Sequence, residues 1–210
     1  MTPAALAQTG LTLADLERLL YEGVEGYNLA TLGRDRRQCH TPDFTYGEVT
    51  PDVISTLLAV TNARPGEVFY DLGAGTGKAV LYAAALGELS KAVGIELLEE
   101  LHQGSMQAHQ RFVTDILPRM PHKQERHVEM RLGDITSEDI SDGDIVFTHC
   151  TCFTNELMDA VARQCATMKS GSRIVTVSKA LPITGDFVLV EQVPCQMAWG
   201  SATLHIHRRV

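Results

Sequence analysis

The sequence predicts an α/β fold: a doubly wound, mainly parallel sheet of seven strands with a helical N-terminal appendage and a terminal antiparallel hairpin. Three observations carry this prediction. Short apolar segments alternate with helical segments between residues 68 and 177, which is typical of parallel sheets covered by helices on both faces. A cluster of glycines directly follows the first apolar segment. The last two apolar segments of the chain are joined without a helical segment between them.

The N-terminal residues are expected to be helical and to form an appendage over residues 1–45, with the main domain over residues 46–210. Leucines at helical spacing follow Thr12, whose hydroxyl can cap a helix by accepting a backbone N–H. Thr50 followed by Pro51 predicts the start of the next helix, because the two residue types suit the cap and the first turn.

From residue 68 onward strands and helices alternate. Helices are expected over residues 78–86, 98–117 and 155–169, and strands over residues 68–72, 91–96, 127–135, 144–150 and 172–179. Two final strands follow over residues 186–193 and 202–209. Because they are joined without a helix, one of them is expected to enter the sheet antiparallel near one edge.

Composition narrows the class of protein. The formal net charge of −8 and the pI near 5.4 argue against strong direct binding of nucleic acid, because neutralised phosphates supply most of such affinity. No apolar run is long enough to span a membrane, and the first residues lack the pattern of a secretory signal. We therefore expect a cytoplasmic protein, or a nuclear one in a eukaryote, without disulfides among its five cysteines and without a metal site.

The glycine cluster lies between Asp71 and Lys78, at the turn from the first strand to the next helix. In open α/β sheets this turn is the usual place for a ligand. A dinucleotide fingerprint would need its third glycine at position 78, which is lysine. A nicotinamide-dependent oxidoreductase therefore remains only as an alternative, to be tested by which cofactor protects the protein from heat.

The spacing D-x-G-x-G-x-G resembles motif I of class I S-adenosylmethionine (SAM)-dependent methyltransferases, which have a Rossmann-like fold. The resemblance implies that Asp71 orients the methionine amino group of SAM. Glu96, at the end of the second strand, would accept the ribose hydroxyls. Asp134 would accept from the adenine amino group, with Ile135 against the ring.

Two further stretches, FTYGEVTPDVI and MKSGSRIVTVSKALP, together with VFYDLGAGTGKAVLYAAA, resemble the catalytic domain of the DOT-type (disruptor of telomeric silencing) histone-lysine methyltransferases over residues 44–182. The resemblance implies that a Tyr-Gly-Glu loop covers the methionine end of SAM. The expected cofactor contacts are Tyr46, Gly47, Glu48, Val49, Tyr70, Asp71, Leu72, Gly73, Ala74, Gly75, Thr76, Gly77, Lys78, Glu96, Asp134, Ile135 and Thr148.

One stretch departs from the family pattern. Where the family carries two asparagines that line the lysine channel, this chain has His149 and Cys150, followed by Phe153 at a family aromatic position. We expect these three residues at the substrate channel, with Phe147 and Trp199 as candidate walls. His149 has an ordinary pKa suited to accepting a proton, and the alternative is a strand-end residue bonded to the backbone.

The resemblance thus implies a SAM-dependent N-methyltransferase acting on a protein lysine and releasing S-adenosyl-L-homocysteine. We expect a protein acceptor, with histones as one candidate, rather than a small molecule. Two alternatives stay open: a small-molecule methyltransferase, whose pocket would be closed by the first 45 residues, and a non-catalytic SAM-binding module. No membrane partner is expected, and the oligomeric state is not predicted.

Overall fold

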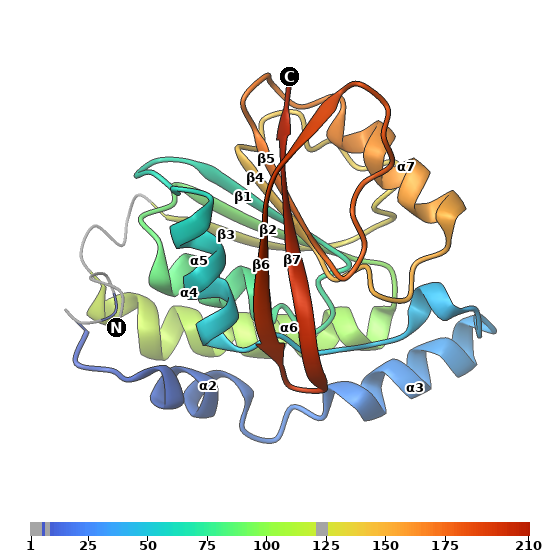
Figure 1. Ribbon diagram of the computed structural model, residues 1–210. Coiled ribbons are helices and arrows are strands. Elements are labelled where there is room, and N and C mark those ends of the chain that lie inside the picture. The colour runs from blue at the N-terminus through green and yellow to red at the C-terminus, as the bar shows by residue number, and fades with distance from the viewer. Residues whose placement is uncertain (1–5, 7–8, 121–125) are drawn as a thin grey trace.

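The computed structural model describes residue 6, residues 9–120 and residues 126–210 (Figure 1). Its strands form one sheet in the order β3-β2-β1-β4-β5-β7-β6. The strands are β1 (Val68–Leu72), β2 (Lys91–Glu96), β3 (His127–Leu132), β4 (Ile145–Thr148), β5 (Arg173–Val177), β6 (Phe187–Met197) and β7 (Gly200–Arg209).

The strand directions confirm the predicted fold class. Strands β1 to β5 pair in parallel, whereas β7 pairs antiparallel with both β5 and β6 and so lies between them. The chain runs from β1 outward through β2 to β3, and then crosses to β4 on the other side of β1. The order therefore reverses between β1 and β4, and open sheets bind ligands at the carboxyl ends of the strands at such a point.

Helices cover both faces of the sheet (Figure 1). Because side chains alternate along a strand, Phe69 of β1 packs with the helices of one face, and Tyr70 and Leu72 pack with α7 on the other. The helices are α2 (Leu13–Tyr21), α3 (Gly26–Arg37), α4 (Pro51–Val60), α5 (Lys78–Leu86), α6 (Glu99–Arg111) and α7 (Asn155–Cys165).

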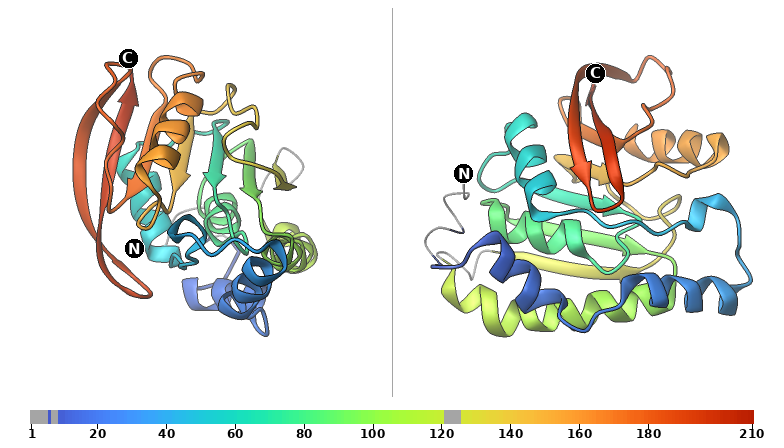
Figure 2. Two further views of the ribbon diagram at one scale, coloured as in Figure 1. Left: turned by 90° about the vertical axis from the view of Figure 1, so that its right-hand side faces the viewer. Right: turned by 60° about the horizontal axis from the view of Figure 1, so that its bottom comes forward.

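The two N-terminal helices lie along α6, as both views of Figure 2 show. Helix α2 begins with a capping box, in which Thr12 accepts from the backbone of Asp15 and Asp15 accepts from the backbone of Thr12. Thr50 caps α4 through the N–H of Val53, as its sequence position indicates. In the described part of the chain no helix has the length and apolarity needed to cross a bilayer.

The helix predicted over residues 98–117 is regular only over α6. Its continuation winds into a π turn (Phe112–Ile116) and a 3-10 turn (Leu117–Arg119). The wider turn still buries Phe112 and Ile116, and Pro118 cannot donate the N–H that an α-helical continuation would need. At the other end of the chain, β6 extends through Pro194 to Met197, because an edge strand tolerates the missing N–H of proline.

Candidate cofactor and substrate site

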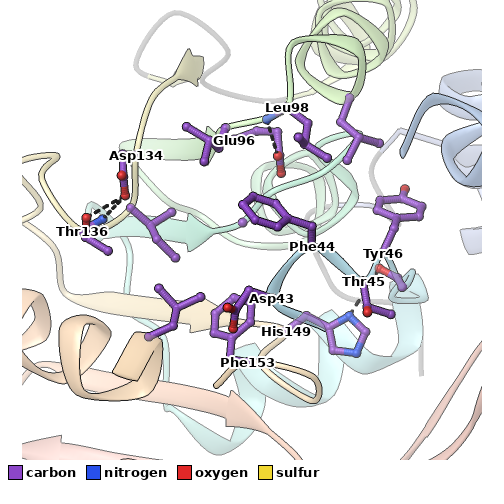
Figure 3. A pocket seen from close by; sticks show the side chains of 16 residues that line it. Asp43, Phe44, Thr45, Tyr46, Glu96, Leu98, Asp134, Thr136, His149 and Phe153 are labelled. Atoms are coloured by element: carbon purple, nitrogen blue, oxygen red, sulfur yellow. Dashed lines mark hydrogen bonds between the residues drawn. The ribbon is translucent and has the colours of Figure 1, made fainter. Parts of the chain in front are cut away.

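A cavity of about 240 Å³ opens at the carboxyl ends of the parallel strands, where the strand order reverses (Figure 3). Glu96 ends β2, Asp134 follows β3 and His149 follows β4, so strands on both sides of β1 each place a polar side chain on its wall. The lining residues are Asp43, Phe44, Thr45, Tyr46, Gly47, Gly73, Glu96, Leu97, Leu98, Leu101, Asp134, Ile135, Thr136, His149, Phe153 and Leu157.

A second, smaller cavity of about 20 Å³ adjoins it under the Tyr-Gly-Glu loop. Four residues line both cavities: Tyr46, Gly47, Gly73 and His149. The remaining residues of the small cavity come from the loop, from β1 and the glycine turn, from α5 and from β4: Glu48, Val49, Asp71, Ala74, Gly75, Lys78, Ala79 and Phe147.

The glycine turn is shaped for close approach. Gly73, Gly75 and Gly77 all have φ in the left-handed region, between 56° and 84°. A Cβ atom on Gly75 would lie 2.5 Å from Cε2 of Tyr46, so a larger residue would displace the aromatic ring. Glycines therefore allow the loop, the turn and the cavity between them to coexist.

Glu96 holds the turn in place through its carboxylate. Oε2 accepts from the backbone N–H of Gly75 at 2.8 Å, and Oε1 accepts from that of Leu98 at 2.8 Å. Burial raises the pKa of Glu96, while the hydrogen bonds from the backbone of Leu98 and Gly75 oppose that shift. The residue therefore both lines the large cavity and fixes two of its backbone segments.

Asp71, at the end of β1, is buried, and its Oδ1 has no hydrogen-bond partner among the described residues. Burial and the neighbouring Glu96 carboxylate raise the pKa of Asp71 well above its ordinary value. A buried acceptor without a donor is costly, and a cationic donor would relieve both the missing bond and the repulsion. This is the arrangement that an ammonium-bearing ligand fits.

Asp134 lies at the opposite end of the large cavity from Tyr46 in Figure 3, and the next residue, Ile135, also lines that cavity. Oδ1 of Asp134 accepts from both the backbone N–H of Thr136 at 2.8 Å and its hydroxyl at 2.7 Å. These bonds fix the carboxylate in an Asx turn. The second oxygen keeps its capacity to accept a hydrogen bond.

The Tyr-Gly-Glu loop is tied to three elements. The hydroxyl of Tyr46 donates to Oε1 of Glu48 at 3.0 Å and accepts from Thr76 at 2.8 Å, because the carboxylate can only accept. Lys78 of α5 pairs with Oε2 of Glu48 at 3.1 Å and with Oε1 of Glu17, on α2, at 2.5 Å. The loop is thus connected to the glycine turn, to α5 and to α2.

His149 packs against the same loop. Its Nδ1 lies 3.3 Å from the carbonyl oxygen of Gly47, and its ring stacks on the indole of Trp199 with centroids 5.6 Å apart and planes 13° apart. A Cβ atom on Gly47 would lie 2.5 Å from Cε1 of His149. The glycine of the loop therefore leaves room for the imidazole ring, and the tip of the β6–β7 hairpin covers that ring.

Seven residues expected at the site line neither cavity: Tyr70, Leu72, Thr76, Gly77, Thr148, Cys150 and Trp199. Three of them make hydrogen bonds between neighbouring segments. Thr148 donates to the carbonyl of Leu72 at 2.9 Å, and the buried thiol of Cys150 donates to the carbonyl of Val177 at 3.3 Å. The hydroxyl of Tyr70 donates to Asp142 at 2.7 Å.

Several lining residues were not identified from the sequence: Asp43, Phe44, Thr45, Leu97, Leu98, Leu101, Thr136 and Leu157. Most adjoin a motif, so proximity in sequence to Tyr46, Glu96 and Asp134 is the signal that could have found them. Asp43 is held by α7, because its carboxylate accepts from the backbone N–H of Thr154 at 2.5 Å.

Comparison with known proteins identifies a family and a set of related folds. The family model described as "Histone methylation protein DOT1" matches residues 39–191. An H3 lysine-79 specific histone-lysine N-methyltransferase from Emericella nidulans is 28% identical over 184 residues, 82% of this chain and 35% of that protein. The corresponding protein from Aspergillus fumigatus is 30% identical over 70% of this chain and 30% of its own length. The chain thus spans about a third of these relatives.

Solved structures show the same fold at low identity. TrmN from Thermus thermophilus has a TM-score of 0.62 and 17% identity, over 88% of this chain and 52% of that one. Magnesium protoporphyrin IX methyltransferase (ChlM) from Synechocystis, solved with bound SAM, has a TM-score of 0.56 and 13% identity, over 94% of this chain and 91% of that one. At such identities the likeness shows the fold alone.

Proposed function

Because this chain belongs to the DOT1 family of histone methylation proteins, we propose that it transfers a methyl group from SAM to the side-chain amine of a protein lysine. The observation that supports cofactor binding best is the buried, unpartnered Oδ1 of Asp71 beside the left-handed glycine turn. The methionyl ammonium of SAM supplies the cation that this oxygen lacks.

The other expected cofactor residues fit the rest of SAM. Glu96 has the acceptor capacity for ribose hydroxyls, and Asp134 that for the adenine amino group. Leu97, Leu98, Leu101 and Ile135 give the large cavity an apolar surface suited to a purine ring. When bound, SAM supplies an electrophilic methyl group on a sulfonium.

The chain's own residues have two further tasks. They align the lysine amine with the methyl group and exclude water, since methyl transfer is an in-line displacement. They also lower the cost of removing the lysine proton, which at a pKa near 10.4 amounts to about 4.6 kcal/mol at pH 7. Phe153 and Phe44 on the cavity wall contribute, because apolar surroundings disfavour the ammonium form.

A protein acceptor is supported by the relatives, which carry the name of histone H3 lysine-79 methyltransferases. One observation favours a second candidate, a small-molecule acceptor: Asp43, Phe44 and Thr45 lie over the large cavity, as the alternative of a covered pocket requires. The net charge of −8 favours free proteins over DNA-bound ones as acceptors.

The test is incubation with radiolabelled-methyl SAM and four acceptors in parallel: core histones, intact nucleosomes, a total protein extract and a metabolite extract. Acid hydrolysis of the labelled protein identifies the modified residue. We expect label in methyl-lysine with at least one protein acceptor, and less label with Asp71→Asn when SAM is kept below the wild-type dissociation constant. Label only in the metabolite extract would replace the proposal by the small-molecule reading, and SAM binding without any label would indicate a non-catalytic module.

A further inference from the structure

The imidazole of His149 has one engaged and one free nitrogen. Nδ1 faces the carbonyl oxygen of Gly47 at 3.3 Å, and because a carbonyl oxygen can only accept, Nδ1 carries the proton. Nε2 therefore has a lone pair. It is buried and has no hydrogen-bond partner among the described residues.

The position of the ring is fixed from two sides. The indole of Trp199 stacks on one face with planes 13° apart, and the missing Cβ of Gly47 admits the ring edge. His149 is also one of the four residues that line both cavities. Since the sulfonium joins the adenosyl and methionyl parts of SAM, a residue that borders both cavities is placed beside the reacting end.

We propose that Nε2 of His149 is the general base of the reaction and removes the proton from the substrate's lysine ammonium. This inference rests on the proposed function. The lysine N–H bond breaks, the proton passes to Nε2, and the electron pair left on nitrogen forms the new N–CH₃ bond as the methyl group leaves sulfur. The products are a methylated ammonium, a neutral thioether and a histidinium, which then releases its proton to solvent.

The electrostatic surroundings suit this role. Burial lowers the pKa of His149, partly opposed by the contact with Gly47, so the ring is neutral at pH 7. Among the ionisable groups that line the cavities with it, Tyr46 borders both, Glu48, Asp71 and Lys78 border the small one, and Asp43, Glu96 and Asp134 border the large one. The thiol of the adjacent Cys150 is turned toward Val177.

A base of this kind changes the pH dependence of the reaction. With His149 neutral and the lysine protonated, the reactive pair is the dominant form across pH 7–9, so the rate is nearly independent of pH there. Without a base, only the small fraction of free amine reacts, and the rate rises about tenfold per pH unit toward the lysine pKa near 10.4.

The experiment compares wild type with His149→Asn between pH 6.5 and 9.5, with radiolabelled SAM, a total protein extract as acceptor, and methyl-lysine counted after hydrolysis. We expect a flat wild-type profile above pH 7 and a slope near one for the variant, with a loss of about 100-fold at pH 7 that shrinks as pH rises. Calorimetry at pH 8 should give both proteins the same SAM affinity. The matched control is His109→Asn, because His109 is a half-buried residue of α6 that lines neither cavity. This variant should keep the flat pH profile of the wild type.

A second readout needs no turnover. Nitrogen NMR of the SAM-free protein with labelled histidine should show His149 with its proton on Nδ1 and neutral down to below pH 6.5. Parallel profiles of wild type and His149→Asn, or the proton on Nε2, would overturn the role of His149 while leaving the function intact. A wild-type protein that binds SAM but forms no methyl-lysine would instead overturn the proposed function, and the base with it.

Discussion

Replacing Asp71 by asparagine should stabilise the SAM-free protein and weaken SAM binding at the same time. The substitution keeps the shape of the side chain but removes a buried charge that faces the Glu96 carboxylate and has an unpartnered oxygen. Asparagine still leaves an oxygen without a partner, but the cost of an unsatisfied buried group, about 1–3 kcal/mol when it is neutral, is larger when it is charged. For a domain of this size a gain of about 2 kcal/mol corresponds to an increase in melting temperature of about 4–8 °C.

The effect has a defined pH dependence. Because the folded-state pKa of Asp71 is raised above its unfolded value, its ionisation destabilises the native state at pH values above the raised pKa. That penalty disappears as pH falls toward the unfolded pKa of about 3.9. The stability difference between Asp71→Asn and wild type should therefore grow from pH 4 to pH 8.

Thermal melts with and without SAM measure both effects in one series. At 100 times the dissociation constant, SAM should stabilise wild type by about 2.7 kcal/mol. The lost charge-assisted bond, worth about 1.5–3 kcal/mol, weakens affinity by about tenfold or more and at least halves this ligand-induced shift. The matched control is Asp142→Asn: that carboxylate accepts from Tyr70 and Lys91, so its loss should lower stability without affecting SAM. A SAM-free Asp71→Asn protein less stable than wild type, with an undiminished SAM shift, would refute the reasoning.

Three further changes test the site and its support. Gly75→Ala should reduce SAM affinity by at least about tenfold, because the added Cβ would displace Tyr46. The control is Gly171→Ala: Gly171 also has a positive φ, but no atom lies within 4 Å of the added Cβ. This control should therefore show only the backbone cost of about 1–2 kcal/mol in a denaturant titration. Lys78→Met should lower the free energy of unfolding by about 1–2 kcal/mol in a urea titration, because it leaves the mostly buried carboxylate of Glu48 without its cation, whereas Glu17 is partly solvated. An unchanged urea midpoint would contradict the ion-pair argument. Arg173→Met, which removes a two-point contact with Glu67, should lower it by about 3 kcal/mol and leave SAM affinity unchanged by calorimetry.

The local sequence pattern was sufficient to predict the central strands of the sheet. The strands 68–72 and 91–96 and the helix 78–86 follow from short apolar runs, glycines and helix-start signals, and the structure places them at those residues. The hairpin inserted beside β5 followed from two consecutive strands without a helix between them. The π turn after Arg111 did not follow, because no single residue type specifies that wider winding.

The site was predictable where its residues adjoin a motif and not where its partners come from distant segments. Asp71 and Glu96 stand out as acidic residues at strand ends, but that Asp71 has an unpartnered oxygen and Glu96 holds Gly75 depends on tertiary packing. The stacking of Trp199 on His149 joins a hairpin tip to a loop about 50 positions earlier in the chain. No local pattern encodes such a contact.

The ion pairs of Lys78 have a thermodynamic consequence for the N-terminal segment. Glu17 lies on α2, before the residues 39–191 that match the family model, whereas Glu48 lies on the loop over the small cavity. The ammonium of Lys78 therefore pairs with two segments, helix α2 and the Tyr-Gly-Glu loop. Docking of α2 and ordering of the loop are coupled equilibria, and coupling of this kind is reciprocal. If the loop contacts SAM as proposed, whatever stabilises the docked α2 also stabilises SAM binding by the loop, and SAM in turn stabilises the docking of α2 by the same factor.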